Sequence, residues 1–279
     1  MARIVGGVTT SHIPAIGNAM AERKENEPYW RRFFAGYEPV KDWLSKVQPD
    51  IAIVIYNDHG LNFFLDNIPT FAIGCADHYE NADEGWGLKT LSAFEGDAQL
   101  SWHLAESLIV QGFDMATCQH MLVDHGFTVP MSLMWRHLPK WPVKVVPLAI
   151  NTVRHPVPAA KRVYALGKAL GDAIRSYPEE LTVVIFGTGG LSHQLQGERA
   201  GLVNVDFDLS CMESVIHRPE WLAGLSTTEI IEKAGTEGVE VIMWLAMRGA
   251  LSDQVRCLHK HYHTPISNTG AGVLLLENT

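Results

Sequence analysis

Short apolar runs alternate along the chain with longer stretches in which polar residues interrupt apolar ones at helical spacing. The short runs are rich in β-branched residues and predict buried strands. These strands are Arg3–Val8, Ile51–Tyr56, Val143–Ile150, Leu181–Phe186 and Val273–Leu276. The predicted helices are Pro39–Val47, Leu100–Gln111, Ala159–Ser176 and Gly238–Gly249. The alternation predicts an α/β fold with a central mixed, largely parallel β-sheet flanked by helices.

No long Pro/Ser-rich or charged stretch marks an interdomain linker, and no internal repeat is visible. We therefore expect residues 1–279 to form a single domain, which is within the size range of one α/β core. The segment Asn62–Ser92 mixes Phe, Asp, Pro and Gly too irregularly for one helix or strand. It predicts a long covering loop, and loops of that length are usually functional.

Composition and charge narrow the class of partner. The chain is 47% hydrophobic and 19% charged, with 22 Lys and Arg against 31 Asp and Glu, so a folded, acidic protein is expected. No basic stripe is present to neutralise phosphates, and no apolar run has the length of a membrane span, so neither nucleic acid nor a membrane is an expected partner. The start of the chain lacks a signal-peptide pattern, and the four cysteines are scattered. Both features favour a cytoplasmic protein.

Three histidines follow predicted strands. His12 comes after the first strand, His59 after Ile51–Tyr56 and His193 after Leu181–Phe186, while His125 lies in a similar Val-Asp-His-Gly context. Ligands of open α/β sheets bind beyond the carboxyl ends of strands, so these imidazoles would converge if the strands are neighbours. The alternative is that they are surface or locally hydrogen-bonded histidines, as most of the 13 in the chain must be.

Glu240 lies in a run, Gly238–Met247, that is apolar nearly all round and predicts a buried helix. A buried carboxylate requires a cationic partner or a metal. Arg248 would supply a structural ion pair. Together with His12 and His59, Glu240 would instead form the two-histidine, one-carboxylate set that binds Fe(II) and leaves coordination positions open.

Other catalytic motifs fit poorly. The glycines Gly187, Gly189 and Gly190 resemble a dinucleotide loop, but that motif would need a further glycine at Ser192. We interpret them as a tight turn that brings His193 to the site. The Ser-His neighbours at Ser11 and Ser192 lack the nucleophile-elbow pattern, and the chain has neither a phosphate-binding loop nor an H-E-x-x-H zinc helix.

Taken together, the motifs resemble the type II extradiol dioxygenases, most of all the β subunits of protocatechuate 4,5-dioxygenases, with gallate dioxygenases next. The resemblance runs along almost the whole chain. It is carried by Ser11–Gly17, Tyr56–His59, Pro69–Gly74, Ala82–Gly87, Val123–Gly126, Gly187–Gly197, Glu237–Glu240 and Ser267–Thr269.

The resemblance implies Fe(II) held by His12, His59 and Glu240, with His193 as the catalytic acid/base. It implies that His125 is a second active-site histidine near substrate and O2. It further implies that Ser267 and Asn268 contact the carboxylate of a catecholic aromatic acid.

The resemblance also implies the reaction and the assembly. Protocatechuate would be cleaved to 4-carboxy-2-hydroxymuconate-6-semialdehyde, with gallate or 3-O-methylgallate as alternative substrates. A small α subunit would cover the site in an (αβ)2 hetero-oligomer, because the chain stops at Thr279, soon after the final strand. Two rival functions remain open: a non-catalytic metal-binding interaction protein on the same scaffold, and a zinc hydrolase.

Overall fold

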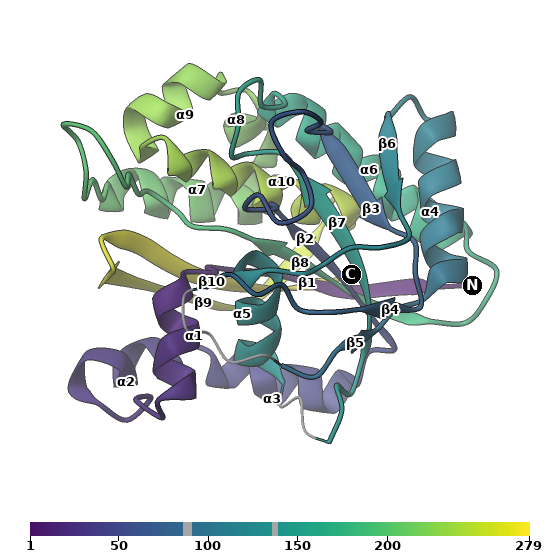
Figure 1. Ribbon diagram of the computed structural model, residues 1–279, viewed down its shortest axis with the longest axis horizontal. Helices are drawn as coiled ribbons and strands as arrows, with labels where there is room; N and C mark the ends of the chain where they lie inside the picture. The colour runs from purple at the N-terminus through teal and green to yellow at the C-terminus, as the bar shows by residue number, and fades with distance from the viewer. Residues whose placement is uncertain (86–90, 136–138) are drawn as a thin grey trace.

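A twisted eight-stranded sheet runs through the centre of the protein, as the computed structural model shows for residues 1–85, 91–135 and 139–279 (Figure 1). The strand order is β6-β3-β7-β2-β8-β1-β10-β9, and β4 (His78–Tyr79) and β5 (Phe94–Glu95) form a separate two-stranded sheet. The strands of the large sheet are β1 (Arg3–Thr10), β2 (Ile51–Tyr56), β3 (Phe71–Gly74), β6 (Met115–Cys118), β7 (Lys144–Ile150), β8 (Thr182–Thr188), β9 (Val255–Ile266) and β10 (Thr269–Asn278).

The middle of the sheet is parallel. Strands β7, β2, β8 and β1 pair in parallel, whereas β10 joins β1 antiparallel and β9 extends the sheet as an antiparallel hairpin with β10. On the other side β3 pairs antiparallel with β7 and parallel with β6. The predicted α/β class and the mixed, largely parallel sheet are therefore confirmed.

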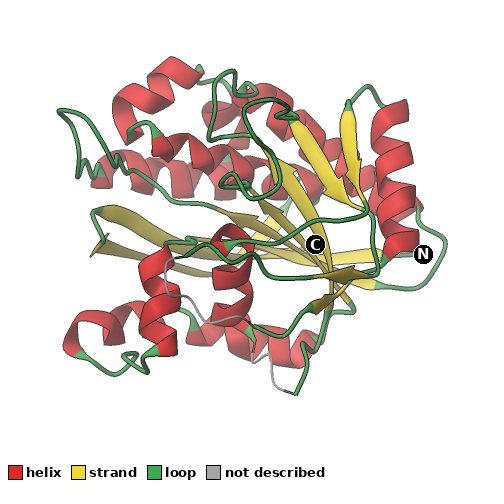
Figure 2. Ribbon diagram, viewed as in Figure 1, coloured by secondary structure: helices red, strands yellow, loops and turns green. Residues whose placement is uncertain are grey.

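Helices cover both faces of the sheet and form two hydrophobic layers (Figure 2). Because the central strands are buried on both faces, β2 is apolar at every position, as is typical of parallel sheets. One face is covered by α4 (Ala98–Val110), α6 (Ala160–Ser176), α7 (Val205–His217), α8 (Pro219–Ala223), α9 (Thr227–Ala234) and α10 (Ile242–Ala250). The other is covered by α1 (Pro14–Ala21), α2 (Pro28–Ala35), α3 (Glu38–Val47) and α5 (His125–Met134). No helix among the described residues is both long and apolar enough to cross a bilayer.

The predicted strands and helices are all present, but two sequence predictions are corrected. The predicted helix Gly238–Gly249 is divided into a 3₁₀ turn, η1 (Glu237–Val241), followed by α10. Short 3₁₀ segments are common at helix starts, and this one holds Glu240. The segment Asn62–Ser92 is not only a loop, because it contributes β3 and β4; its residues 86–90 lie outside the described part of the chain. The strand β3 is a fully buried run of four residues, too short to be recognised by periodicity.

Candidate metal centre

The carboxyl ends of three adjacent parallel strands bring the predicted histidines together. Strands β2, β8 and β1 are consecutive in the sheet, and His59, His193 and His12 follow them in the chain. Because parallel strands end at the same edge, the loops that follow them meet there. The condition on which the sequence argument depended, that these strands are neighbours, is met.

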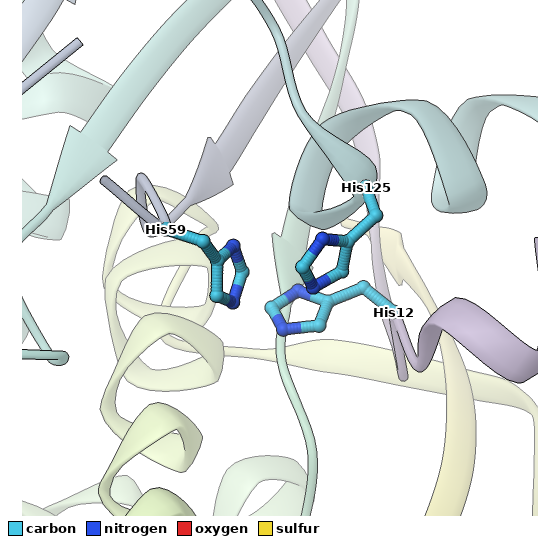
Figure 3. Close-up of side chains that lie close together, drawn as sticks. All are labelled: His12, His59 and His125. Atoms are coloured by element: carbon cyan, nitrogen blue, oxygen red, sulfur yellow. The ribbon is translucent and has the colours of Figure 1, made fainter. Parts of the chain in front are cut away.

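One ring nitrogen from each of His12, His59 and His125 lies within 4.8 Å of the other two (Figure 3). The ring centroids are 5.3 Å apart for His12 and His59, 5.6 Å for His12 and His125, and 3.9 Å for His59 and His125. His125 is the first residue of α5, His59 lies in the loop after β2, and His12 lies between β1 and α1. This is a group of residues that could hold a metal ion.

The carboxylate of Glu240 lies beside this group. Its Oε2 is 3.2 Å from His12 Nε2 and its Oε1 is 4.0 Å from His59 Nε2. Asn57 Nδ2 donates to Oε1 over 3.3 Å, and the backbone N–H of Gly190 donates to Oε2 over 2.7 Å. Burial alone would raise the pKa of Glu240, but the surrounding imidazoles and hydrogen bonds outweigh it and lower the pKa below its ordinary value.

Arg248 is not the partner of Glu240. Its guanidinium donates instead to the backbone carbonyls of Ser252 and Asp253, over 2.9 and 2.7 Å. Within the described residues, Glu240 forms ion pairs only with histidines. The structural ion pair that the sequence left open is therefore excluded, and the buried carboxylate keeps its need for a cation.

Each histidine of the group is oriented through its Nδ1 atom. His59 Nδ1 lies 3.0 Å from Asp124 Oδ2, His12 Nδ1 lies 3.1 Å from Thr188 Oγ1, and His125 Nδ1 lies 2.5 Å from Glu84 Oε2. Next to a carboxylate, Nδ1 carries the proton, so the lone pair of a neutral imidazole is on Nε2.

Sequence reasoning did not identify Asp124, Glu84 or Thr188 as part of the site. Asp124 and Glu84 lie inside motifs that carry the family resemblance, but nothing local indicates the histidine that each contacts. Asp124 is 65 residues from His59, and Glu84 is 41 residues from His125. Only an alignment or a fold would have shown these pairings.

His193 approaches Glu240 from the loop after β8. Its Nε2 is 3.9 Å from Glu240 Oε2, and its Nδ1 lies 3.0 Å from the carbonyl oxygen of Leu191. A carbonyl only accepts hydrogen bonds, so Nδ1 is the protonated nitrogen and Nε2 is the basic one in the neutral ring.

The glycine-rich loop before His193 has the shape that the sequence predicted. Gly189 has a φ of 119°, and a Cβ there would lie 2.9 Å from the Cβ of Glu240. The backbone must therefore come close to Glu240, which only glycine permits. Ser192 donates its hydroxyl hydrogen to Asp208 rather than to a histidine, which is no arrangement for a serine nucleophile.

Ser267 and Asn268 lie in the turn between β9 and β10, both at positive φ, 48° and 60°. Both are exposed. The next residue, Thr269, forms an isolated β-bridge with His193. The turn is thus close to His193 along the backbone, although its side chains are not part of the group formed by the histidines and Glu240.

A cavity of about 190 Å³ opens beside His59. Apolar side chains such as Phe63 and Ile68 form much of its wall, and Arg154 adds a positive charge. Among the described residues that line the cavity, His59 is the only member of the site: His12, His125, His193 and Glu240 do not line it. The cavity is large enough for one aromatic ring, because a site of roughly 150 Å³ accommodates benzene.

Comparison with known proteins gives a family match along most of the chain. The family model described as "Catalytic LigB subunit of aromatic ring-opening dioxygenase" matches residues 6–274. The chain is 44% identical over 197 residues to gallate dioxygenase of Pseudomonas putida, an alignment that covers 71% of this chain and 58% of that protein. It is also 26% identical over 318 residues to 2,3-dihydroxyphenylpropionate/2,3-dihydroxicinnamic acid 1,2-dioxygenase of Photorhabdus laumondii, with 97% of this chain and 96% of that enzyme covered.

The fold is also shared with a solved structure. An uncharacterized protein of Escherichia coli K12 superimposes with a TM-score of 0.63 at 13% sequence identity, covering 97% of this chain and 99% of that one. At that identity the likeness concerns the arrangement of strands and helices alone.

Proposed function

Because the chain belongs to the family of catalytic LigB subunits of aromatic ring-opening dioxygenases, we propose that it cleaves the ring of a catecholic aromatic acid with O2, in the extradiol manner. The cofactor in this proposal is Fe(II), held by His12, His59 and Glu240. The observation that supports it most is the meeting of two imidazole nitrogens with a buried carboxylate that has no Lys or Arg partner among the described residues.

The donor set fits Fe(II). Two neutral imidazoles and one carboxylate form the facial arrangement that leaves positions open for further ligands. The Oδ1 atom of Asn57 is buried without a hydrogen-bond partner in the described structure, while its Nδ2 lies 3.1 Å from His59 Nε2 and also reaches Glu240. The polar groups at this point thus remain incompletely satisfied by protein alone.

His125 offers a second choice of ligand set. Its ring nitrogen lies with those of His12 and His59, so three imidazoles would also hold a metal. We favour Glu240 because its charge is buried and otherwise has only histidines to compensate it. In this assignment His125 faces the substrate and O2, and Glu84 fixes its ring.

When bound, Fe(II) would supply positive charge that favours deprotonation of the catechol hydroxyls, and it would provide a path by which electrons of the catecholate reduce O2. The remaining roles fall to side chains. His193 Nε2 is unprotonated in the neutral ring and accepts the proton that the catechol loses, because Nδ1 donates to Leu191. His193 later returns a proton as the ring opens. His125, in its protonated form with Nδ1 held by Glu84, donates a hydrogen bond from Nε2 to a developing negative oxygen.

The substrate would be gallate, protocatechuate or 3-O-methylgallate. Gallate gains support from the relative in Pseudomonas putida, which is named a gallate dioxygenase. Protocatechuate 4,5-cleavage, to 4-carboxy-2-hydroxymuconate-6-semialdehyde, rests on the sequence resemblance alone. These acids differ by one ring substituent, so a few contacts decide between them. Ser267 and Asn268 would bind the carboxylate that all three acids have in common.

The chain is proposed to work as one catalytic domain, residues 1–279, with a small α subunit over the site in an (αβ)2 assembly. The exposed apolar side chains of Phe64 and Leu65, which border the cavity beside His59, are compatible with such a cover. We also propose a cytoplasmic location, because the described cysteines, Cys75, Cys118, Cys211 and Cys257, are all free thiols.

An oxygen-uptake panel tests the function. Protein loaded anaerobically with Fe(II) is mixed with gallate, protocatechuate or 3-O-methylgallate, with and without a candidate α subunit, and O2 consumption and ring-opened product are measured. We expect uptake with at least one acid and none with protein loaded with Zn²⁺. No uptake with any acid under either condition would favour the metal-binding interaction protein instead.

A further inference from the structure

Asp208 is a buried carboxylate that has no role in the function proposed above. It lies in the first turn of α7 and is only 1% exposed. It accepts three hydrogen bonds, each 2.7 Å long, from the backbone N–H of Ser192, the hydroxyl of Ser192 and the hydroxyl of Tyr262. Burial raises the pKa of Asp208, and within the described residues no Lys or Arg pairs with it. Burying a carboxylate without a cationic partner costs free energy, so a specific role is expected of Asp208 at this position.

Through Ser192, Asp208 fixes the segment that carries His193. The hydroxyl of Ser192 accepts a hydrogen bond from the backbone N–H of Asn204 over 2.7 Å, so its single proton is given to Asp208. Ser192 immediately precedes His193, and its carbonyl accepts from the backbone N–H of Gly270 over 2.9 Å. The peptide next to His193 is therefore held on one side by Asp208 and on the other by β10.

Through Tyr262 and Gly270, the same carboxylate contacts the β9–β10 hairpin. Tyr262 belongs to β9, and Gly270 to the start of β10. A Cβ at Gly270 would lie 2.1 Å from Asp208 Oδ2, so the carboxylate occupies the space that this glycine leaves. The turn formed by Ser267 and Asn268 ends this hairpin only two residues before Gly270.

We propose that Asp208 is a positioning residue that holds His193 at a fixed place relative to the turn Ser267–Asn268. This inference rests on the proposed function, in which His193 moves the proton and the turn binds the carboxylate of the substrate. From α7, the Asp208 carboxylate is hydrogen-bonded to the loop after β8 through Ser192 and to β9 through Tyr262, and it occupies the space left by Gly270 in β10. Asp208 itself contacts neither metal ligands nor substrate and acts only through these neighbours.

The variant Asp208→Asn tests this directly. An amide has one accepting oxygen in place of two, so it cannot satisfy all three donors, while the volume stays almost the same. We expect unchanged iron content and a fall in kcat of about 100-fold, since a displacement of about 1 Å costs that much in a positioned reaction. The matched control is Asp206→Asn, an exposed aspartate two residues earlier on α7, which should match the unaltered protein.

Two further variants separate the two connections. Ser192→Ala removes the link to His193 and should lower kcat with little change in the KM of the acid. Tyr262→Phe removes the link to the hairpin and should raise that KM by about tenfold, the value of one hydrogen bond to a charged group, with a smaller effect on kcat. Tyr262→Phe also serves if Asp208→Asn does not fold.

A binding arm keeps the result independent of turnover. Under anaerobic conditions, the iron-loaded protein is titrated with protocatechuate and with catechol, which lacks the carboxylate, and the optical change is followed. Asp208→Asn should weaken protocatechuate about tenfold and leave catechol unchanged. If the unaltered protein binds protocatechuate but consumes no O2, the proposed ring cleavage is wrong. The role of Asp208 is then tested by the change in affinity for protocatechuate relative to the change in affinity for catechol.

Any of the following results would overturn the proposal. The first is an Asp208→Asn protein with a lower melting temperature but normal kcat and KM per bound iron, which would indicate a purely structural residue. The second is loss of iron in proportion to activity. The third is equal weakening of protocatechuate and catechol, or no binding of either to the unaltered protein.

Discussion

Asp124 accepts hydrogen bonds from both the backbone N–H and the ring Nδ1 of His59, over 2.7 and 3.0 Å. Its other oxygen accepts from the backbone N–H of Gly126 and so caps α5, the helix that begins at His125. Burial alone would raise the pKa of Asp124, but the His59 imidazole and its N–H donors outweigh it and lower the pKa to about 2. One ionised carboxylate thus sets the position of two histidines whose rings are 3.9 Å apart.

The variant Asp124→Asn should weaken iron binding by about 10- to 100-fold, the range known for groups that orient metal ligands. Asparagine has only one accepting oxygen, so either His59 or the start of α5 loses its partner. The measurement is competition for Fe(II) with a chelator, followed by metal analysis. Asp42→Asn, at an exposed position on α3, is the control. Unchanged affinity in the Asp124 variant would show that His59 is oriented without this carboxylate.

Glu240→Gln and His125→Gln together decide between the two ligand sets. If His12, His59 and Glu240 hold the iron, Glu240→Gln should leave the protein nearly free of iron because an amide is a far weaker ligand than a carboxylate. His125→Gln should keep its iron and lose turnover. Both are checked by iron content per folded chain, with circular dichroism as the test of folding. The opposite pattern, in which the histidine variant loses the metal, would establish the three-histidine site.

Glu84→Gln tests whether Glu84 serves the site through His125. Glu84 contacts both the backbone N–H and the ring Nδ1 of His125, over 2.6 and 2.5 Å. Removing its charge should leave iron in place and lower kcat by about tenfold or more, because the ring loses both its orientation and its fixed proton. Asp83→Asn, the exposed neighbour, should behave like the unaltered protein. Loss of iron from the Glu84 variant would instead make His125 a ligand.

The sequence predicted the sheet and the histidines because both follow from local patterns. Apolar runs such as Ile51–Tyr56 are buried on both faces in the structure. A histidine follows each of three adjacent parallel strands, so the three histidines lie at the same edge of the sheet. The family is likewise confirmed by the match over residues 6–274. The assignment of each side chain as ligand or acid/base remains a prediction.

Two features could not be predicted from local patterns. The 3₁₀ turn that holds Glu240 contacts the loop at Gly189 and Gly190. Gly190, which donates a hydrogen bond to Glu240, is 50 residues away from it in the sequence. The carboxylates of Asp124, Glu84 and Asp208 act on residues that are distant in sequence or in another element. The spacing of apolar residues predicts helices and strands, but it does not indicate which polar side chains form hydrogen bonds with one another, because the tertiary fold determines those pairs.

His193→Phe separates proton transfer from metal binding. Phenylalanine keeps a ring in the loop after β8 but removes the basic Nε2, so iron content should stay near that of the unaltered protein. Turnover should fall by about 10²- to 10⁴-fold, the usual contribution of a positioned acid/base. O2 uptake per bound iron is the measurement. If iron and activity fell together, the separation of roles between His193 and the ligands would be wrong.

His261 gives the protein a stability that depends on pH. The ring lies in β9 against Gly36, where an added Cβ would be 2.1 Å from it, and its Nε2 is buried without a hydrogen-bond partner in the described structure. Burial lowers the pKa of His261 below 6.5, and the neighbouring His263, His259 and Arg32 lower it further. Protonation of the folded protein is therefore unfavourable at this position.

The free energy of unfolding should then decrease as the pH falls below about 6.5, since the unfolded chain takes up a proton that folded His261 refuses. The decrease should level off below the lowered pKa of the folded state, where both states are protonated. Urea unfolding between pH 7.5 and 5.5 measures it, and His261→Gln should flatten this dependence. His120→Gln, at an exposed histidine, should leave the slope unchanged. An unaltered slope in the His261 variant would assign the pH dependence to other groups whose pKa is lower in the folded protein than in the unfolded chain, such as His263, because they contribute with the same sign.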